Sequence, residues 1–251
     1  IRLSLVGSEM CIRDRYIIVL VIMVIAFTSC QNTHKKEVSI LVKHSGALRT
    51  IMSGNIQPVI SLDTLSKKKH LYALGAVDNL KGEIQIFDSK PSNSFVIDSS
   101  LQIKDSYSLK ASLLVYAEVE EWDTFQIENS KTKSDLEEQI FELATNSGIN
   151  TEEPFPFLLE GIIASVDWHV INWKDGDTIH NHKKHKESGL NGTLANRRVQ
   201  IIGFYSTKHK AVFTHHTTNM HMHFKTDDNA IAGHIDDLSF NQTVTLKLPK
   251  K

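Results

Sequence analysis

Histidine is the residue type that most clearly offers chemistry in this chain. The chain has 13 His, and ten of them lie from His169 to His234. The densest stretch places His221 and His223 two residues apart, ahead of a turn-rich segment and His234. Alternate residues of a strand face the same side, so His221 and His223 project together, and a turn over 226–229 brings His234 beside them. Three neutral imidazoles with an open position are the ligand set of a catalytic zinc, which predicts a Zn²⁺ site here.

The other histidines of this region favour plainer interpretations. Three of them lie in Thr178–Asn191 among several lysines, a pattern that predicts a solvated polar loop. These three are His180, His182 and His185. His215 and His216 are adjacent, so on a strand they face opposite sides and at most one joins a cluster. For the zinc motif itself, the alternatives are a solvated strand face and a surface that binds metal adventitiously.

The elements around these histidines indicate an α+β fold. Apolar and β-branched runs predict strands over 38–42, 84–87, 95–97, 112–119, 157–171, 199–205, 211–214, 220–224 and 244–248. A short helix is expected over 47–53, and a longer one opens with a capping box at 134–137 and stops at Gly148. No repeat or linker divides the chain, so we predict one domain over 38–251. Its sheets are mixed or mostly antiparallel, with a few peripheral helices.

Composition excludes several classes of protein. The chain has 251 residues, 41% of them hydrophobic, and a net charge of −1, values typical of a soluble globular protein. Without a basic surface to neutralise phosphates, a nucleic-acid partner is not expected. The two cysteines, Cys11 and Cys30, both precede the expected domain. Disulfides and thiolate metal sites are therefore excluded from that domain.

The start of the chain, 1–29, is predicted to be a leader. Residues 16–27 form an uninterrupted apolar run with the length of a signal-peptide core. The run leads into Cys30 through a segment that resembles the lipobox of bacterial lipoproteins, with a plain secretory signal as the alternative. Residues 30–37 then form a polar tether, whereas 1–15 resemble translated adaptor sequence and are assigned no function. We expect an exported protein that touches the membrane of the bacterial cell envelope only through a lipid anchor at Cys30.

Three segments of the chain resemble the bacterial acetolactate decarboxylases. That family has a His-x-His-Phe motif, an acidic turn and a Gly-Gly-His, and residues 221–234 read HMHFKTDDNAIAGH. Residues 74–88 contain Gly82 and Glu83 ahead of a strand, similar to the Leu-x-Gly-Glu segment of the family. Residues 199–204 are similar to the strand that precedes the metal-binding hairpin.

The resemblance implies a two-part αβ fold, zinc bound by the three histidines, and conversion of 2-acetolactate to acetoin and carbon dioxide. By the same resemblance, Glu83 relays a proton or positions the substrate. His169 stands where the family has an Arg, so we predict a catalytic role for it, while the family's Glu near the C-terminus has no counterpart. The expected partner is a small-molecule substrate, and a homodimer is one option for the assembly. Two alternatives stay open: a cupin-like metalloenzyme acting on another substrate, and a non-enzymatic envelope lipoprotein that binds metal or another ligand.

Overall fold

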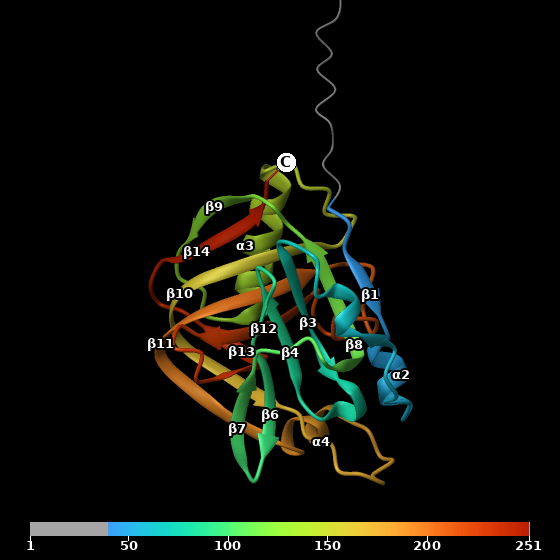
Figure 1. Ribbon diagram of the computed structural model, residues 1–251. Helices are drawn as coiled ribbons and strands as arrows, with labels where there is room; N and C mark the ends of the chain where they lie inside the picture. Colours follow the sequence, from blue (N-terminus) through green and yellow to red (C-terminus); the bar gives the residue numbers. More distant parts are fainter. Residues whose placement is uncertain (1–39, 251) are drawn as a thin grey trace, which may run out of the picture. The chain divides into compact units, whose positions relative to one another are not determined.

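The structure is a computed structural model that describes residues 40–250 (Figure 1). The leader and tether predicted over 1–37 lie outside the described residues. Within 40–250 the strands are β1 Lys43–Ser45, β2 Ile60–Ser61, β3 Leu71–Val77, β4 Glu83–Phe87, β5 Lys90–Pro91, β6 Asn93–Ile97, β7 Ser100–Lys104, β8 Lys110–Glu118, β9 Trp122–Ile127, β10 Phe155–Val170, β11 Leu190–Tyr205, β12 Met220–Thr226, β13 Ala232–Ser239 and β14 Val244–Pro249. The helices are α2 Leu48–Met52, α3 Lys133–Asn146 and α4 His182–Glu187, with 3-10 turns η1 Leu62–Leu65 and η2 Asp78–Leu80. None of these helices is long and apolar enough to span a membrane.

The first sheet is built from the first half of the described chain. Its strand order is β1-β8-β3-β4-β6-β7, with β2 added to β8 and β5 added to β4. Each of these strand pairs is antiparallel. All five residues of β4 are buried, because side chains pack on both faces of the sheet at this strand.

The second sheet is built mainly from the second half, in the order β11-β12-β13-β10-β14-β9. The two 16-residue strands β10 and β11 pair antiparallel from Phe155↔Tyr205 to Val170↔Leu190. The start of β10 also pairs with β14, and its end pairs with β13. Strands β10, β11, β12 and β13 therefore close into a ring, which fixes the positions of the residues at the end of β10 relative to those of β12 and β13.

The two sheets pack together through a shared apolar cluster. It contains Leu74 and Leu113 from the first sheet and Leu158 and Phe204 from the second. A separate cluster that includes Met222 fills the far side of the second sheet, under α3. The second sheet therefore has one face towards that far cluster and one face towards the first sheet. Polar side chains on the latter face can meet polar side chains of the first sheet.

The prediction of mostly antiparallel sheets with a few helices is confirmed. The predicted short helix corresponds to α2, and the longer one to α3. The capping box of α3, however, lies two residues closer to the N-terminus than the predicted one at 134–137. Thr132 caps the helix and Asp135 closes the box, because Glu137 instead accepts hydrogen bonds from the side chains of Thr218 and Asn219.

One predicted strand, and the described part of another, are wrong. Residues 211–214 form a turn, with Ala211 at φ +58°, and Phe213 inserts into the core there. At the start of the domain the strand begins at Lys43 and residues 40–42 are not in a strand, since β8 pairs with 43–45. The segment 178–191 is not simply a loop, because it contains α4 and the start of β11.

Candidate metal centre

The three histidines of the predicted zinc motif converge. His221 and His223 lie on the same face of β12, while the intervening Met222 is in the core on the other face. His234 on β13 is the register partner of His223. The nitrogens that face one another are 3.1 Å apart for His221 Nε2 and His234 Nδ1, 3.2 Å for the Nε2 atoms of His221 and His223, and 3.3 Å for His223 Nε2 and His234 Nδ1. We call these three residues the triad.

Two hydrogen bonds determine which nitrogens of His221 and His223 are unprotonated. His221 Nδ1 donates to the carbonyl oxygen of Phe213 at 2.7 Å. His223 Nδ1 donates to Oε1 of Gln85 at 3.2 Å, and the amide nitrogen of Gln85 donates to the carbonyl oxygen of Ser92. With both Nδ1 atoms protonated, the Nε2 atoms of two neutral rings present lone pairs to each other. Such partners orient metal-binding imidazoles in known sites.

The spacing of the triad fits a zinc ion. Zinc–nitrogen bonds are about 2.0–2.1 Å long, and the ligands of a tetrahedral ion are then about 3.3 Å apart. The three observed separations, 3.1 to 3.3 Å, agree with that value. A cation would also relieve the repulsion between the facing lone pairs, so the donor set suits a divalent metal bound by His221, His223 and His234.

Burial keeps the triad neutral. It lowers the pKa of His221 to about 3 and holds the pKa values of His223 and His234 well below the usual range. Charge on neighbouring histidines adds to this effect in each case. A neutral imidazole is the form that ligates metal, so the triad is ready to bind metal at neutral pH.

Glu83 lies at the start of β4, facing the triad across the sheet interface. Its side chain is buried, with Oε2 3.8 Å from His223 Nε2 and Oε1 3.9 Å from His169 Nε2. The backbone N–H of Ile171 donates to Oε1 at 3.2 Å. Burial raises the pKa of this carboxyl well above its usual range, although the Ile171 hydrogen bond opposes the shift. Glu83 is therefore a protonatable group directly beside the candidate metal position.

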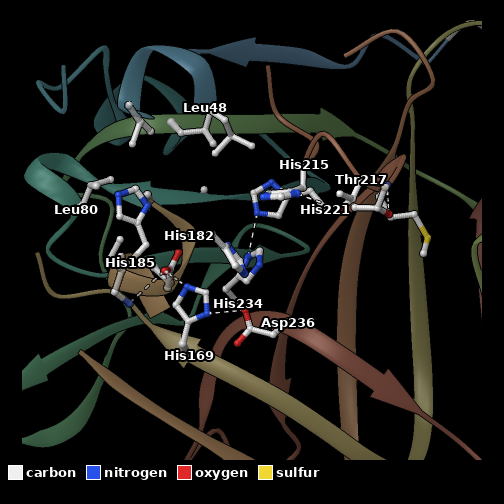
Figure 2. Close-up of a pocket in the computed structure, with 18 of the residues that line it drawn as sticks. Leu48, Leu80, His169, His182, His185, His215, Thr217, His221, His234 and Asp236 are labelled. Atoms are coloured by element: carbon white, nitrogen blue, oxygen red, sulfur yellow. Dashed lines mark hydrogen bonds and ion pairs between the residues drawn. The ribbon is translucent and has the colours of Figure 1, made fainter. Parts of the chain in front are cut away.

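His169 lies at the end of β10, in register with His234. The two rings are 4.8 Å apart between centroids. Nδ1 of His169 is 3.0 Å from Oδ1 of Asp236, whose Oδ2 pairs with Lys186 Nζ at 3.0 Å. Asp236 thus holds the His169 ring (Figure 2), and Nε2 of that ring faces Glu83.

A cavity of about 300 Å³ opens beside the triad (Figure 2). Apolar side chains from α2, η2 and β8 form one wall, and histidines, Glu83 and Lys133 form the other. Among the described residues that line the cavity, Lys133 is the one with a Lys or Arg side chain. Its Nζ lies 3.5 Å from the backbone carbonyl oxygen of Asp236 and, within residues 40–250, forms no ion pair with a carboxylate. The cavity therefore contains a cation that is available to an anionic ligand.

The five predicted site residues meet at this cavity or directly beside it, while their roles stay predictions. Sequence reasoning missed Gln85, Lys133 and Asp236. Asp236 had a signal, because it is two residues beyond His234 and so shares its strand face. For Lys133 the sequence signal was its place in the first turn of a helix. A cation there interacts unfavourably with the helix dipole, which suggests that it has a role outside the helix.

The prediction of a loop over 178–191 is wrong for His182 and His185, which lie on α4, whereas the predicted exposure agrees for His182. His182 and His185 both line the cavity, because α4 turns this segment back towards the sheets. His215 and His216 do not lie on a strand, since a turn precedes β12, and His215 also lines the cavity. No sequence signal relates these residues to the triad, because the contacts are made between separate segments.

Two antiparallel sheets with a histidine triad and a buried carboxyl at their interface define a β-rich protein with a candidate metal site between its sheets. Residues 42–250 match the family model for alpha-acetolactate decarboxylase. The chain belongs to this family, and the resemblance inferred from its motifs is confirmed.

Solved structures show the same fold. An alpha-acetolactate decarboxylase from Bacillus subtilis strain 168 is 15% identical, with 84% of this chain and 86% of that chain covered and a TM-score of 0.66. A protein of unknown function from Staphylococcus aureus, similar to alpha-acetolactate decarboxylase, gives the same values. The acetolactate decarboxylase of Bacillus subtilis subspecies spizizenii is 14% identical over the same shares of the two chains, with a TM-score of 0.68. At these identities the likeness concerns the fold alone. No curated protein matches the chain.

Proposed function

We propose that this protein is a zinc-dependent decarboxylase that converts 2-acetolactate, or a closely related 2-hydroxy-3-oxo acid, to a hydroxyketone and carbon dioxide. With 2-acetolactate the products are acetoin and carbon dioxide. One observation carries the proposal: three imidazole nitrogens that face one another lie within 3.3 Å of one another, beside a cavity that is also lined by Glu83. Membership of the alpha-acetolactate decarboxylase family supports the type of reaction.

The triad would hold the metal, with one position left for the substrate. A β-keto acid loses its carboxylate only if the electron pair left behind is stabilised. The chemistry that a zinc ion supplies when bound here is Lewis-acid stabilisation of that negative charge on the ketone and hydroxyl oxygens. The hydrogen bonds to Phe213 and Gln85 keep His221 and His223 oriented for this purpose.

Glu83 supplies the proton in this proposal. After carbon dioxide has left, the carbon that carried the carboxylate must be protonated. Because burial raises the pKa of Glu83 well above its usual range, its carboxyl group is more readily protonated than an exposed one, as a general acid requires. The Ile171 N–H fixes Oε1, and His169, held by Asp236, faces the same oxygen. The proton is therefore delivered from one defined side of the cavity.

Lys133 binds the substrate carboxylate in this proposal. Carboxylates that enter a partly buried site need a cationic partner, and Lys133 is the cation that lines the cavity. His169, at the position of the family's Arg, has its Nδ1 engaged by Asp236. Lys133 comes from α3 instead of β10, so the positive charge reaches the cavity from a different element. Across the cavity, Leu80 and Leu113 offer apolar contacts for the methyl groups.

The test is decarboxylation by the purified, zinc-loaded protein. With 2-acetolactate as substrate, we expect release of carbon dioxide and formation of acetoin. His221→Ala should remove both metal and activity. Glu83→Gln should retain metal and lose activity by about 10²-fold or more, the usual contribution of a positioned acid. His70→Ala is the control, because His70 is exposed and pairs with Asp88, away from the cavity lining.

The result that would overturn the proposal is a wild-type protein that binds zinc at the triad but decarboxylates neither 2-acetolactate nor related 2-hydroxy-3-oxo acids. Turnover of a different substrate would then favour a metalloenzyme of another class. Absence of turnover would favour a metal- or ligand-binding envelope protein.

We also propose that the protein is exported and anchored through a lipid on Cys30. The support is the apolar run at 16–27 and the lipobox-like segment that follows it. In cells, Cys30→Ala should abolish lipid labelling and release the protein from the membrane fraction. Unchanged membrane retention of the variant would contradict a lipid anchor at this position.

A further inference from the structure

A second group of histidines surrounds the outer part of the cavity. His182 and His185 come from α4, and His215 and His216 come from the turn-rich segment between β11 and β12. All four line a hollow of about 340 Å³. Three of the four, all except His216, also line the cavity of the triad, and Figure 2 shows these three around it. The outer histidines are thus near the candidate metal centre without belonging to it.

The rings of His182 and His215 are spaced like two ligands of one ion. Their centroids are 5.1 Å apart and their planes are inclined by 61°. Within the triad, the three ring pairs have centroid separations of 5.0, 5.0 and 5.2 Å and inclinations between 61° and 88°. The pair of outer rings therefore has the separation and tilt of the rings that the structure presents as a metal site.

Both rings keep nitrogens that can bind a ligand. Nδ1 of His215 lies 3.0 Å from the hydroxyl oxygen of Thr217, and its Nε2 has no hydrogen-bond partner among the described residues. Within residues 40–250 the ring of His182 makes no hydrogen bond. By contrast, His180 and His185 are already paired, with Nδ1 and Nε2 2.9 Å apart. His185 is thus engaged and His216 is the chain neighbour of His215, so His182 and His215 are the facing rings from separate segments that can bind one metal.

Local contacts hold the two rings in place. Asn181 caps α4 by accepting from the backbone N–H of Lys184 at 2.9 Å, so His182 is at the first position of a capped helix. On the other side, Glu137 accepts hydrogen bonds from Thr218 and from both the backbone and the side chain of Asn219. These bonds anchor the segment that carries His215 to α3. The two histidines thus belong to separate segments that are each fixed to the domain.

The charge state of the two rings suits a metal and not an anion. Burial lowers the pKa of His215 to about 4, and nearby His216 and His182 lower it further. Burial also lowers the pKa of His182, although Asp236 opposes the shift. At neutral pH both rings are uncharged, so they offer lone pairs to a metal and no net charge to a phosphate or carboxylate.

We propose that His182 and His215 form a second binding site for Zn²⁺ or a similar divalent transition metal, at the outer end of the cavity. Two imidazoles ligate the ion and water completes its coordination. With two protein ligands instead of three, the site binds metal more weakly than the triad. Imidazole favours zinc, copper and nickel over magnesium or calcium, so the site selects transition metals. This inference does not depend on the decarboxylation proposed above.

The experiment is a titration of the metal-free full chain with Zn²⁺, followed by calorimetry and by competition with a chromophoric chelator. Wild-type protein should bind two Zn²⁺ per chain in two affinity classes. His182→Gln and His215→Gln should each lose the weak class and keep the tight one. A double variant of the triad, His221→Ala with His223→Ala, should lose the tight class and keep the weak one.

Two controls make the titration decisive. Because His182 and His215 are near the surface, Gln at either position leaves the fold intact. Circular dichroism checks this. The matched control is His216→Gln. His216 lines the same outer hollow and follows His215 in the chain, but it is not a proposed ligand, so this variant should retain both affinity classes. The inference would be overturned if wild-type protein bound only one Zn²⁺ per chain. It would also be overturned if His182→Gln and His215→Gln both kept the tight and the weak affinity class.

Discussion

Gln85→Leu is the substitution that most directly tests how the triad is built. Gln85 is fully buried on β4 and does not touch the candidate metal position. Its Oε1 accepts the Nδ1 hydrogen of His223 at 3.2 Å. Leucine fills a similar volume and offers no acceptor. When His223 presents Nε2 to a metal, its Nδ1–H would then point at an apolar side chain.

The size of the effect follows from that unsatisfied group. A buried donor left without an acceptor costs about 1–3 kcal/mol. The metal-free protein avoids this cost, because its ring can change tautomer or tilt, so the cost falls on the metal-bound state. Zinc affinity should therefore drop by about 5- to 150-fold. Losses of about 10- to 100-fold are typical when a partner of a metal-binding histidine is removed.

The assay is zinc affinity by chelator competition, combined with thermal unfolding of the metal-free protein. Gln85→Glu is the matched control, because its carboxylate still accepts from His223. Neither variant can donate to the carbonyl oxygen of Ser92 as the Gln85 amide does, so both should unfold at a lower temperature than wild type. Only Gln85→Leu should also lose zinc affinity.

Two results would refute this reasoning. Wild-type zinc affinity in Gln85→Leu would show that the hydrogen bond to His223 does not support metal binding. An equal loss of affinity in the Leu and Glu variants would show that the substitutions act through the fold and not through the orientation of the ring.

Three further predictions concern the cavity and its surroundings. Lys133→Gln should retain zinc and raise KM for 2-acetolactate about 10- to 150-fold, since a hydrogen bond to a charged group contributes about 1.5–3 kcal/mol. Steady-state kinetics with Lys133→Arg as control measure this, and an unchanged KM would exclude the role. Burial lowers the pKa of His185 to about 4, so the folded metal-free protein binds fewer protons than the unfolded chain between about pH 6.5 and pH 4 and its stability falls as pH falls through that window. In urea titrations across that range, His185→Gln should have a shallower decline, and parallel declines would contradict this. An added Cβ at Gly75 would lie 2.0 Å from the carbonyl oxygen of Leu113, so Gly75→Ala should lower the free energy of unfolding by about 1–3 kcal/mol, and an unchanged urea midpoint would rule out the close approach of β3 and β8.

Several features followed from local sequence because their physics is local. Strand alternation correctly placed His221 and His223 on one face, and the turn after β12 was close enough in sequence to predict that His234 returns beside them. The family was also recognisable from these motifs. The triad was predicted from residues within about fifteen positions of one another, and each of the three segments that resemble the family is equally short.

Helix boundaries were less certain because the local signal was ambiguous. Both 132–135 and 134–137 fit a capping box at the start of α3. The structure uses Thr132 and Asp135, since Glu137 is engaged by Thr218 and Asn219. A tertiary contact therefore decided between two local motifs of similar strength.

By itself, the sequence determined the composition of the triad and the family, and it limited the sheets to mixed or mostly antiparallel ones. Only the tertiary structure decided that Gln85 orients His223, that Lys133 reaches the cavity, and that His182 meets His215. The physical reason is that strand periodicity and turn chemistry act over a few residues. Contacts such as Gln85 with His223, 138 positions apart, depend instead on how the two sheets pack, and no local pattern encodes that packing.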